Sequence, residues 1–296
     1  MIIIRQAIRV PRVLPLLIAG GLVISACSST NAAGDPFLKG PSSITKSGAV
    51  QVLIEGDSLA LTLGVGISGG QEAYGLHIID DGDLGCGIAS GDPIMLAGVQ
   101  YTYTAGMPSP DPDQPPNCPD WKQIWTSNLV DSQPDVVMIL VGRWEIVNRM
   151  HDGQWMNIGE PAYNSYIRSQ LEAAVRLAGS QGARVVLLTM PYVAPQSAPD
   201  GTLYPETIPA RVDQFNAIVR QVAAEHSNWV SVIDLNAMLD PAGKYTSQVG
   251  AVTTRNLVDA NGVPDGTHIS PAGGEMVAQK ILPKLTKLGS LARQSG

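Results

Sequence analysis

Short apolar runs alternate along this chain with stretches of helical periodicity. Two of the runs, Val136–Val141 (VVMILV) and Arg184–Thr189 (RVVLLT), are almost entirely apolar. Runs of this kind are typical of parallel strands covered on both faces, because a strand with one solvated face alternates apolar and polar residues. The repeated strand-then-helix pattern predicts an α/β fold with a doubly wound, mostly parallel sheet flanked by helices.

The pattern predicts about five strands and a helix after each of them. The expected strands are Ala49–Ile54, Leu76–Ile79, Val136–Val141, Arg184–Thr189 and Val230–Asp234. The expected helices are Ser58–Ile67, Asp120–Ser132, Tyr163–Gln181, Ile208–His226 and Pro271–Leu288. Residues 82–117 and 234–265 are rich in turn-forming residues and are expected to be long loops. In such sheets, binding sites lie beyond the carboxyl ends of the strands.

The first 26 residues have the features of a targeting segment. Three arginines precede an apolar stretch, Val13–Ile24, which is too short to span a bilayer comfortably. The stretch ends in Ile-Ser-Ala-Cys27, which resembles the lipobox of bacterial lipoproteins. The resemblance implies a signal peptide over 1–26, a lipid on Cys27, and an exported protein anchored to the extracytoplasmic face of a bacterial membrane. The alternative is an ordinary secretory signal. Residues 27–48, rich in Ser, Ala and Gly, are expected to be a tether.

The composition limits the classes of partner. The chain is 44% hydrophobic and 15% charged, which is ordinary for a folded protein, and its formal net charge is −7. Because an acidic chain repels phosphate backbones, and no basic cluster occurs in the sequence, a nucleic acid is not expected as a partner.

The cysteines fit an oxidising compartment. With Cys27 assigned to lipid, Cys86 and Cys118 remain, and an even number of thiols in such a compartment predicts a disulfide between them. The bridge would close a loop of about 30 residues and stabilise the fold by roughly 3 kcal/mol. The alternative is two free, buried thiols.

A serine follows the first expected strand directly. The segment reads Glu55-Gly-Asp-Ser58-Leu59, and Gly56 permits a tight turn between strand and helix. A hydroxyl at that position projects from the carboxyl edge of the sheet, where the N–H groups of a helix start favour developing negative charge. By itself, the pattern fits a helix-capping serine equally well.

A second polar segment precedes the last expected helix. It reads Asp265-Gly-Thr-His268, and Asp265 and His268 are close enough in sequence to form a hydrogen-bonded pair within one loop. A serine hydroxyl needs a base to take its proton, and that base needs an orienting carboxylate. The two segments together therefore indicate a hydroxyl nucleophile with its base, whereas His268 alone would be read as a surface loop residue.

These two segments carry a resemblance to a known family. Glu55–Leu59 resembles the GDSL block of SGNH hydrolases, and Asp265–His268 resembles their terminal D-x-x-H block. The likeness covers about residues 49–290, within one expected domain of residues 49–292, and it implies the flavodoxin-like three-layer sandwich of that family. It also implies a catalytic triad of Ser58, Asp265 and His268, with no cofactor and no metal.

The family's oxyanion donors are matched only in part. The resemblance implies backbone N–H groups of Ser58 and Gly85, the latter in the acidic segment Asp80–Gly85. A calcium site built from Asp80, Asp81 and Asp83 is an alternative, although the spacing does not fit an EF-hand loop. The family's G-x-N-D block corresponds to Gly142-Arg-Trp-Glu145, in which the oxyanion Asn is absent. Arg143 or a backbone N–H is the expected substitute.

Trp144 and Glu145 are the candidate substrate-binding residues, and packing of the loop is the alternative for both. The Gly-Cys86 and the Cys118-x-x-Trp121 patterns also resemble the extracytoplasmic SGNH domains associated with membrane O-acyltransferases. Trp121, Trp125 and Trp155 are expected in the core rather than in the site.

The expected activity is that of an extracytoplasmic serine esterase. Its expected substrates are short acyl esters of cell-envelope glycans or other small esters, and its expected membrane contact is the lipid on Cys27. The alternatives are an O-acyltransferase acting on the same glycans and a non-catalytic module that binds a glycan or a partner on the same scaffold. A long-chain lipase is disfavoured because no apolar lid segment is evident.

Overall fold

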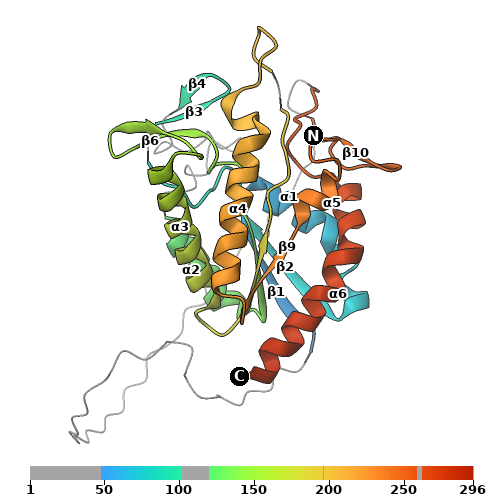
Figure 1. Ribbon diagram of the computed structural model, residues 1–296. Helices are drawn as coiled ribbons and strands as arrows, with labels where there is room; N and C mark the ends of the chain where they lie inside the picture. Colours follow the sequence, from blue (N-terminus) through green and yellow to red (C-terminus); the bar gives the residue numbers. More distant parts are fainter. Residues whose placement is uncertain (1–47, 92, 102–119, 196, 259–261, 296) are drawn as a thin grey trace, which may run out of the picture. The chain divides into compact units, whose positions relative to one another are not determined.

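The computed structural model describes residues 48–91, 93–101, 120–195, 197–258 and 262–295 (Figure 1). The predicted signal peptide, the lipidation site at Cys27, nearly all of the predicted tether, and Cys118 lie outside the described residues. Within the described residues, every helix is too short or too polar to cross a membrane.

A five-stranded parallel sheet forms the centre of the domain. Its strands stand in the order β2-β1-β5-β8-β9, and each neighbouring pair is parallel. The strands are β1 (Val50–Gly56), β2 (Leu76–Gly82), β5 (Val136–Leu140), β8 (Arg184–Leu188) and β9 (Val230–Ile233). The predicted doubly wound α/β fold is therefore confirmed, with all five strands at the expected places.

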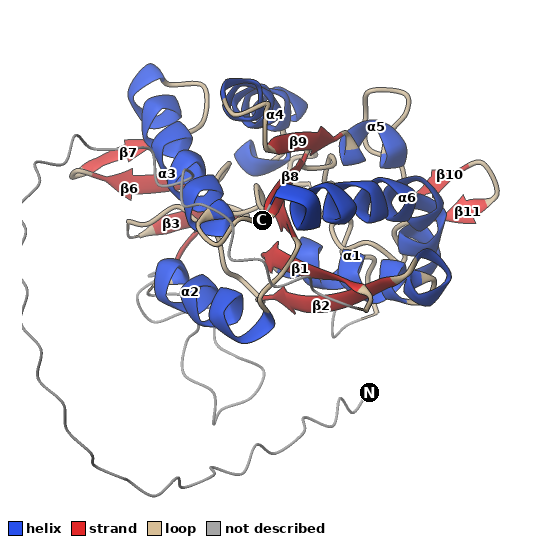
Figure 2. Ribbon diagram, turned by 90° about the horizontal axis from the view of Figure 1, so that it is seen from below, coloured by secondary structure: helices blue, strands red, loops and turns tan. Residues whose placement is uncertain are grey.

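Helices cover both faces of this sheet (Figure 2). One face carries α1 (Ser58–Ser68) and α6 (Pro271–Ser295), and the other carries α2 (Trp121–Ser132), α3 (Pro161–Gly179) and α4 (Pro209–Glu225). Because α1 connects β1 to β2 on one face and α2 leads to β5 on the other, the winding reverses between β1 and β5. That point, at the carboxyl ends of the strands, is where ligands bind in sheets of this kind.

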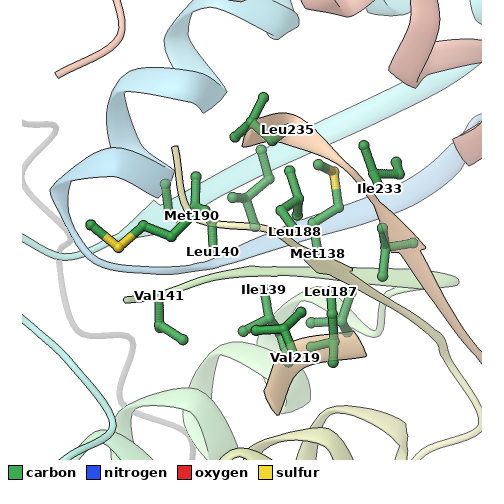
Figure 3. Close-up of a cluster of buried hydrophobic side chains, with 14 of the residues drawn as sticks. Met138, Ile139, Leu140, Val141, Leu187, Leu188, Met190, Val219, Ile233 and Leu235 are labelled. Atoms are coloured by element: carbon green, nitrogen blue, oxygen red, sulfur yellow. The ribbon is translucent and has the colours of Figure 1, made fainter. Parts of the chain in front are cut away.

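The strands are apolar on both faces because both faces are covered. Met138, Leu140 and Leu188 point to one side of the sheet, whereas Ile139 and Leu187 point to the other (Figure 3). All of these side chains are at most 1% exposed. This two-sided burial explains why the strands read as unbroken apolar runs rather than as alternating ones.

A second sheet corrects one expectation. The region expected to be a long loop contains β3 (Ile94–Leu96) and β4 (Val99–Tyr101), and these strands join β6 (Asn148–His151) and β7 (Gln154–Met156) in the order β4-β3-β6-β7. All three pairings in this sheet are antiparallel. Ile94 and Leu96 pack with Trp144 and Val147 in a small apolar cluster of their own.

The remaining elements are short. They are the 3₁₀ turns η2 (Gln71–Tyr74) and η4 (Pro205–Thr207), the helix α5 (Leu235–Leu239), and the hairpin β10 (Gln248–Val249) and β11 (Val252–Thr253). The last three lie in residues 234–265, which were expected to be a loop. A buried ion pair fixes this region, because Arg255 Nη2 lies 2.8 Å from Asp240 Oδ2 and both side chains are at most 1% exposed.

Candidate active site

Ser58 is the first residue of α1 and follows the end of β1 by two residues. Asp57 caps the helix, since its Oδ1 accepts a hydrogen bond from the Leu59 N–H (2.8 Å). Gly56 makes the turn with a φ of +146°, and a Cβ there would lie 1.9 Å from the Leu140 carbonyl oxygen. Only glycine fits this turn. Ser58 thus lies at the point where the winding of the sheet reverses, and as the first helical residue it has no intrahelical acceptor for its N–H.

Asp265 and His268 form the expected pair within one tight loop. Asp265 Oδ1 accepts from the N–H groups of Thr267 (2.8 Å) and His268 (3.0 Å), and Asp265 Oδ2 lies 2.8 Å from His268 Nδ1. Gly266 has a φ of +61°, and a Cβ on it would lie 2.0 Å from the Ala194 carbonyl oxygen. The loop is therefore packed tightly against the segment that follows β8.

The structure brings this pair to Ser58. His268 Nε2 lies 2.7 Å from Ser58 Oγ, across 210 positions of sequence. Because the Asp265 carboxylate accepts from Nδ1–H, the imidazole is held in the tautomer whose Nε2 accepts a proton. The hydroxyl of Ser58 then donates to Nε2, which is the arrangement that activates a serine.

Two helices keep the pair and the serine together. Thr62 Oγ1, one turn into α1, accepts from the Ile269 N–H (3.3 Å) just after His268. Further along, α1 crosses α6 at Gly66 and Gly274, where a Cβ on either glycine would lie 2.5 Å from the Cα of the other. The crossing is close enough that only glycines fit there, so it sets the distance between the starts of the two helices.

The electrostatics keep Asp265 ionised. Partial burial by itself raises the pKa of Asp265, but the hydrogen bonds from His268 and from the Thr267 N–H outweigh it and hold the pKa below its usual range. A carboxylate at neutral pH is what the orientation of His268 requires.

The loop that carries Gly85 lies beside the serine. Asp83 N–H donates to the Gly56 carbonyl (2.9 Å), two residues before Ser58, and Cys86 N–H donates to the Asp83 carbonyl (3.3 Å). Gly85, between them, has a φ of +77°. Cys86 is 6% exposed and disulfide-bonded. Because Cys118 lies outside the described residues, the pairing of these two cysteines stays a prediction.

The segment after β5 holds this loop in place. Glu145 is fully buried, and its Oε1 accepts from the N–H groups of Ile88 (2.7 Å) and Ala89 (3.2 Å). Trp144 is 7% exposed and packs under β3. The geometry therefore assigns Trp144 and Glu145 to packing and loop support. Contact of either side chain with substrate stays a prediction.

Arg143, the other residue of this segment, is 7% exposed, and its Nη1 has no hydrogen-bond acceptor among the described residues. Burial lowers the pKa of the guanidinium, and the charges of Glu206 and Asp57 oppose that shift. The Arg143 side chain is therefore a buried guanidinium with an unused donor. Such a group is suited to receive a negative charge.

The acidic residues near β1 and β2 lie beside one another. Glu55 stands opposite Asp81 in the register of the two strands, and burial raises its pKa to about 9. Burial raises the pKa of Asp80 to about 7. Within the described ranges, no three His, Cys, Asp or Glu side chains are arranged to hold a metal ion, so the calcium alternative gains no support.

Several supporting residues could not be recognised in the sequence. Asn216 of α4 uses its amide to bind both the N–H (2.8 Å) and the carbonyl (2.9 Å) of Met190, next to Gly142. Asp240 Oδ2 accepts from the Tyr192 N–H (2.9 Å) beside the loop of Gly266. No local motif marks such residues, because their partners are far away in sequence. The expected core positions of Trp121 and Trp125 are confirmed, whereas Trp155 is 41% exposed.

The fold is similar to that of a solved esterase. The native aryl esterase of M. smegmatis is 17% identical, with a TM-score of 0.50 over 81% of this chain and 100% of that one. A carbohydrate acetylesterase from Sinorhizobium meliloti is 16% identical, with a TM-score of 0.48 over 81% of this chain and 99% of that one. A GDSL-like lipase from Bacteroides thetaiotaomicron is 13% identical, with a TM-score of 0.48 over 80% and 88% of the two chains. At these identities, the likeness concerns the fold.

No curated protein sequence matches the chain. A family model described as "Protein of unknown function (DUF459)" matches residues 114–284. The matched region includes Gly142–Glu145 and Asp265–His268 but begins after Ser58. Since it covers more than half of the sequence, the chain belongs to the DUF459 family.

Proposed function

We propose that this protein is a serine esterase in which Ser58 is the nucleophile, His268 the general base and Asp265 the orienting carboxylate. The observation that carries the proposal is the unbroken hydrogen-bonded row Ser58 Oγ–His268 Nε2 and His268 Nδ1–Asp265 Oδ2, at 2.7 and 2.8 Å. A serine that only capped α1 would not need an imidazole on its hydroxyl. The capping role belongs to Asp57.

The proposed reaction runs in two halves. Ser58 Oγ attacks the acyl carbon of an ester while His268 Nε2 takes the hydroxyl proton, and His268 then gives that proton to the leaving alcohol oxygen. Water attacks the acyl-serine in the second half, again with His268 as base, and releases the carboxylic acid. The steps use protein groups and water only.

The negative oxygen of each tetrahedral intermediate needs donors. The proposed donors are the N–H of Ser58, which opens α1, the N–H of Gly85, and the buried guanidinium of Arg143 in place of the absent Asn. The close approach of the Gly85 loop to Gly56 supports the second assignment, and the unused Nη1 of Arg143 supports the third.

The proposed substrates are short acyl esters, acetyl esters among them, carried by glycans of the cell envelope. The support is the lipoprotein-like N-terminus, which predicts an exported, lipid-anchored protein facing that material. The fold's likeness to an aryl esterase makes p-nitrophenyl acetate a suitable first probe.

The test compares three proteins on p-nitrophenyl acetate. Wild type is expected to turn over, Ser58→Ala to lose the activity, and Ser68→Ala to keep it. Ser68 is a matched control because it lies in the same helix and its hydroxyl donates to the Gly64 carbonyl, away from His268. Equal activity of wild type and Ser58→Ala would exclude the mechanism. A folded wild type with no activity on any acyl ester would favour a binding module on the same scaffold.

A further inference from the structure

A buried ion pair lies in the part of the chain that leads to His268. Asp240 follows α5 and Arg255 follows β11, and Arg255 Nη2 lies 2.8 Å from Asp240 Oδ2, with both side chains at most 1% exposed. Burial raises the pKa of Asp240 and lowers the pKa of Arg255, and in each case the charge of the partner opposes the shift. Each charge therefore stabilises the other.

The pair is hydrogen-bonded to two backbone segments. Asp240 Oδ2 also accepts from the Tyr192 N–H (2.9 Å), in the segment that follows β8, and Asp240 Oδ1 accepts from the Thr246 N–H (2.9 Å), just before β10. Arg255 Nη1 donates to the Thr246 carbonyl (3.0 Å). The two side chains therefore connect the segment of Tyr192 to the hairpin of β10 and β11 and to Arg255 itself.

The segment of Tyr192 contacts the His268 loop (residues 265–270) before the histidine. Ala194, two residues after Tyr192, donates its N–H to the Gly266 carbonyl (2.8 Å). The contact is close, since a Cβ on Gly266 would lie 2.0 Å from the Ala194 carbonyl oxygen. A movement of the Tyr192 segment would therefore move Gly266, two residues before His268.

The residues next to Arg255 contact the same loop after the histidine. The Ser270 N–H donates to the carbonyl of Thr254 (2.8 Å), which is fully buried, and Ser270 Oγ donates to the Thr253 carbonyl (2.7 Å). Ser270 comes two residues after His268. The two segments that the ion pair connects therefore hold the loop on both sides of the histidine.

The place of this loop decides whether His268 can act. Asp265 orients the imidazole from within the loop, but the 2.7 Å from His268 Nε2 to Ser58 Oγ depends on where the whole loop lies against α1. A misplacement of about 1 Å at such a site can cost about 10²-fold in rate.

We infer that Asp240 and Arg255 are a positioning pair for His268: by connecting the segments of Tyr192 and Thr254, they hold the His268 loop at hydrogen-bonding distance from Ser58. Both residues act through backbone contacts. This inference rests on the proposed function.

Arg255→Met removes the cation and keeps an unbranched side chain. With p-nitrophenyl acetate as substrate, kcat of the folded protein is expected to fall about tenfold or more, while KM stays within about twofold, because the ester still binds but the proton transfer to His268 is impaired. A kcat equal to that of wild type would overturn the inference.

Arg293→Met is the matched control. Arg293 Nη2 lies 2.7 Å from Oδ2 of the buried Asp135, in an ion pair at the other end of α6 from His268. Both variants are expected to lose stability, as a urea titration measures, but only Arg255→Met is expected to lose kcat per folded protein. Equal losses of kcat in the two variants would show a general effect of destabilisation and would overturn the inference.

A double-mutant cycle tests whether the effect passes through His268. The readout is the rate at which a fluorophosphonate labels Ser58. Arg255→Met is expected to lower this rate about tenfold or more by itself, and to cause no further loss in a His268→Ala background, because the group that the pair positions is already gone. The same fold loss in both backgrounds would overturn the inference.

Asp240→Asn serves if Arg255→Met does not fold, because it removes the other charge and keeps an oxygen that can accept from the backbone. The same selective loss of kcat is expected, and an unchanged kcat would again count against the inference. Ser58→Ala is measured alongside. If wild-type activity does not depend on Ser58, the proposed function fails. If it depends on Ser58 but not on the ion pair, only this inference fails.

Discussion

Asp265 does two things at once for His268. Its Oδ1 fixes the backbone of the loop through the N–H groups of Thr267 and His268, and its Oδ2 fixes the imidazole. The variant Asp265→Asn keeps the first function, fixing the loop, and loses the second, fixing the imidazole. The amide oxygen still accepts from the backbone, but the amide group no longer enforces the tautomer that leaves Nε2 free to accept.

We therefore expect Asp265→Asn to keep its stability within about 1 kcal/mol and to lose roughly 10³–10⁴-fold in kcat. Steady-state kinetics on p-nitrophenyl acetate and a denaturant titration measure the two quantities. A loss of less than tenfold would mean that Asp265 is only a loop residue.

The raised pKa of Glu55 predicts that the stability of the protein depends on pH. Burial raises its pKa to about 9 in the folded protein, although Asn128 Nδ2 donates to both of its oxygens (3.3 and 3.4 Å). In the unfolded chain this group ionises near its ordinary pKa of 4.5. Between those two values the folded state binds the extra proton, so Glu55 lowers the stability as pH rises through this window, by up to about 1.4 kcal/mol per pH unit.

Glu55→Gln removes this contribution and keeps an oxygen for Asn128. We expect the free energy of unfolding of wild type to fall relative to that of the variant as pH rises from about 5 to about 8. Urea titrations at several pH values measure the difference. A difference that stays constant with pH would contradict the assignment.

Residues in contiguous motifs could be predicted, and residues that meet through the fold could not. Ser58, Asp265 and His268 belong to two short segments, each of which is recognisable by itself. Glu206 looks like an ordinary surface charge in the sequence, yet it is 2% exposed and accepts from the Ala97 N–H, 109 positions away.

At the scale of elements, the contact between α1 and α6 determines how close Ser58 and His268 lie. Gly66 and Gly274 let the two helices approach closely, and Ser58 and His268 lie near the starts of these helices. Gly274→Ala puts a Cβ 2.5 Å from the Gly66 Cα, so the helices must separate. We expect a loss of about 1–3 kcal/mol in stability, as for other overpacked sites, together with a lower kcat.

Gly69→Ala is the matched control. It lies at the end of α1 with helical backbone angles, and its Cβ would have no neighbour within 4 Å. Wild-type kcat is expected for it. If Gly274→Ala also keeps full stability and kcat, the helix crossing does not set the geometry.

The strands that the sequence pattern missed are short. β3 and β4 have three residues each, in a region whose Gly, Pro and Asp content indicated a loop. β6 reads NRMH and therefore lacks the apolar run that marks the central strands. β3 and β4 form one hairpin and β6 and β7 form another. The two hairpins join where Ile94 pairs with Arg149, 55 positions away, and no local pattern records that pairing.

At the scale of the whole domain, α6 also contacts the amino ends of the central strands, at the end of the sheet opposite Ser58. Arg293, near the end of α6, donates to the carbonyls of Gly48 (2.8 Å) and Ala49 (2.6 Å) and to Asp135 Oδ2 (2.7 Å). Asp135 is 3% exposed, and its Oδ2 also accepts from the Gln51 N–H (2.8 Å). The Arg293 side chain thus connects α6 to the residues just before β1 and just before β5.

Arg293→Met removes this cation from the buried Asp135. We expect a loss of about 3 kcal/mol in stability, because removing one partner of a buried ion pair is costly, and an unchanged kcat for the folded fraction. Lys287→Met, an exposed position in the same helix, controls for the loss of a positive charge. Equal denaturation midpoints for the two variants would show that the contacts of Arg293 contribute little to stability.

The central claim is that His268 makes Ser58 a nucleophile. A fluorophosphonate probe forms a covalent bond with such a serine, and peptide mass spectrometry locates the label. The account predicts a label on Ser58 of the wild-type protein and a labelling rate at least about 100-fold lower in folded His268→Ala. An unlabelled Ser58 in folded wild-type protein, or equal labelling rates in both proteins, would contradict it.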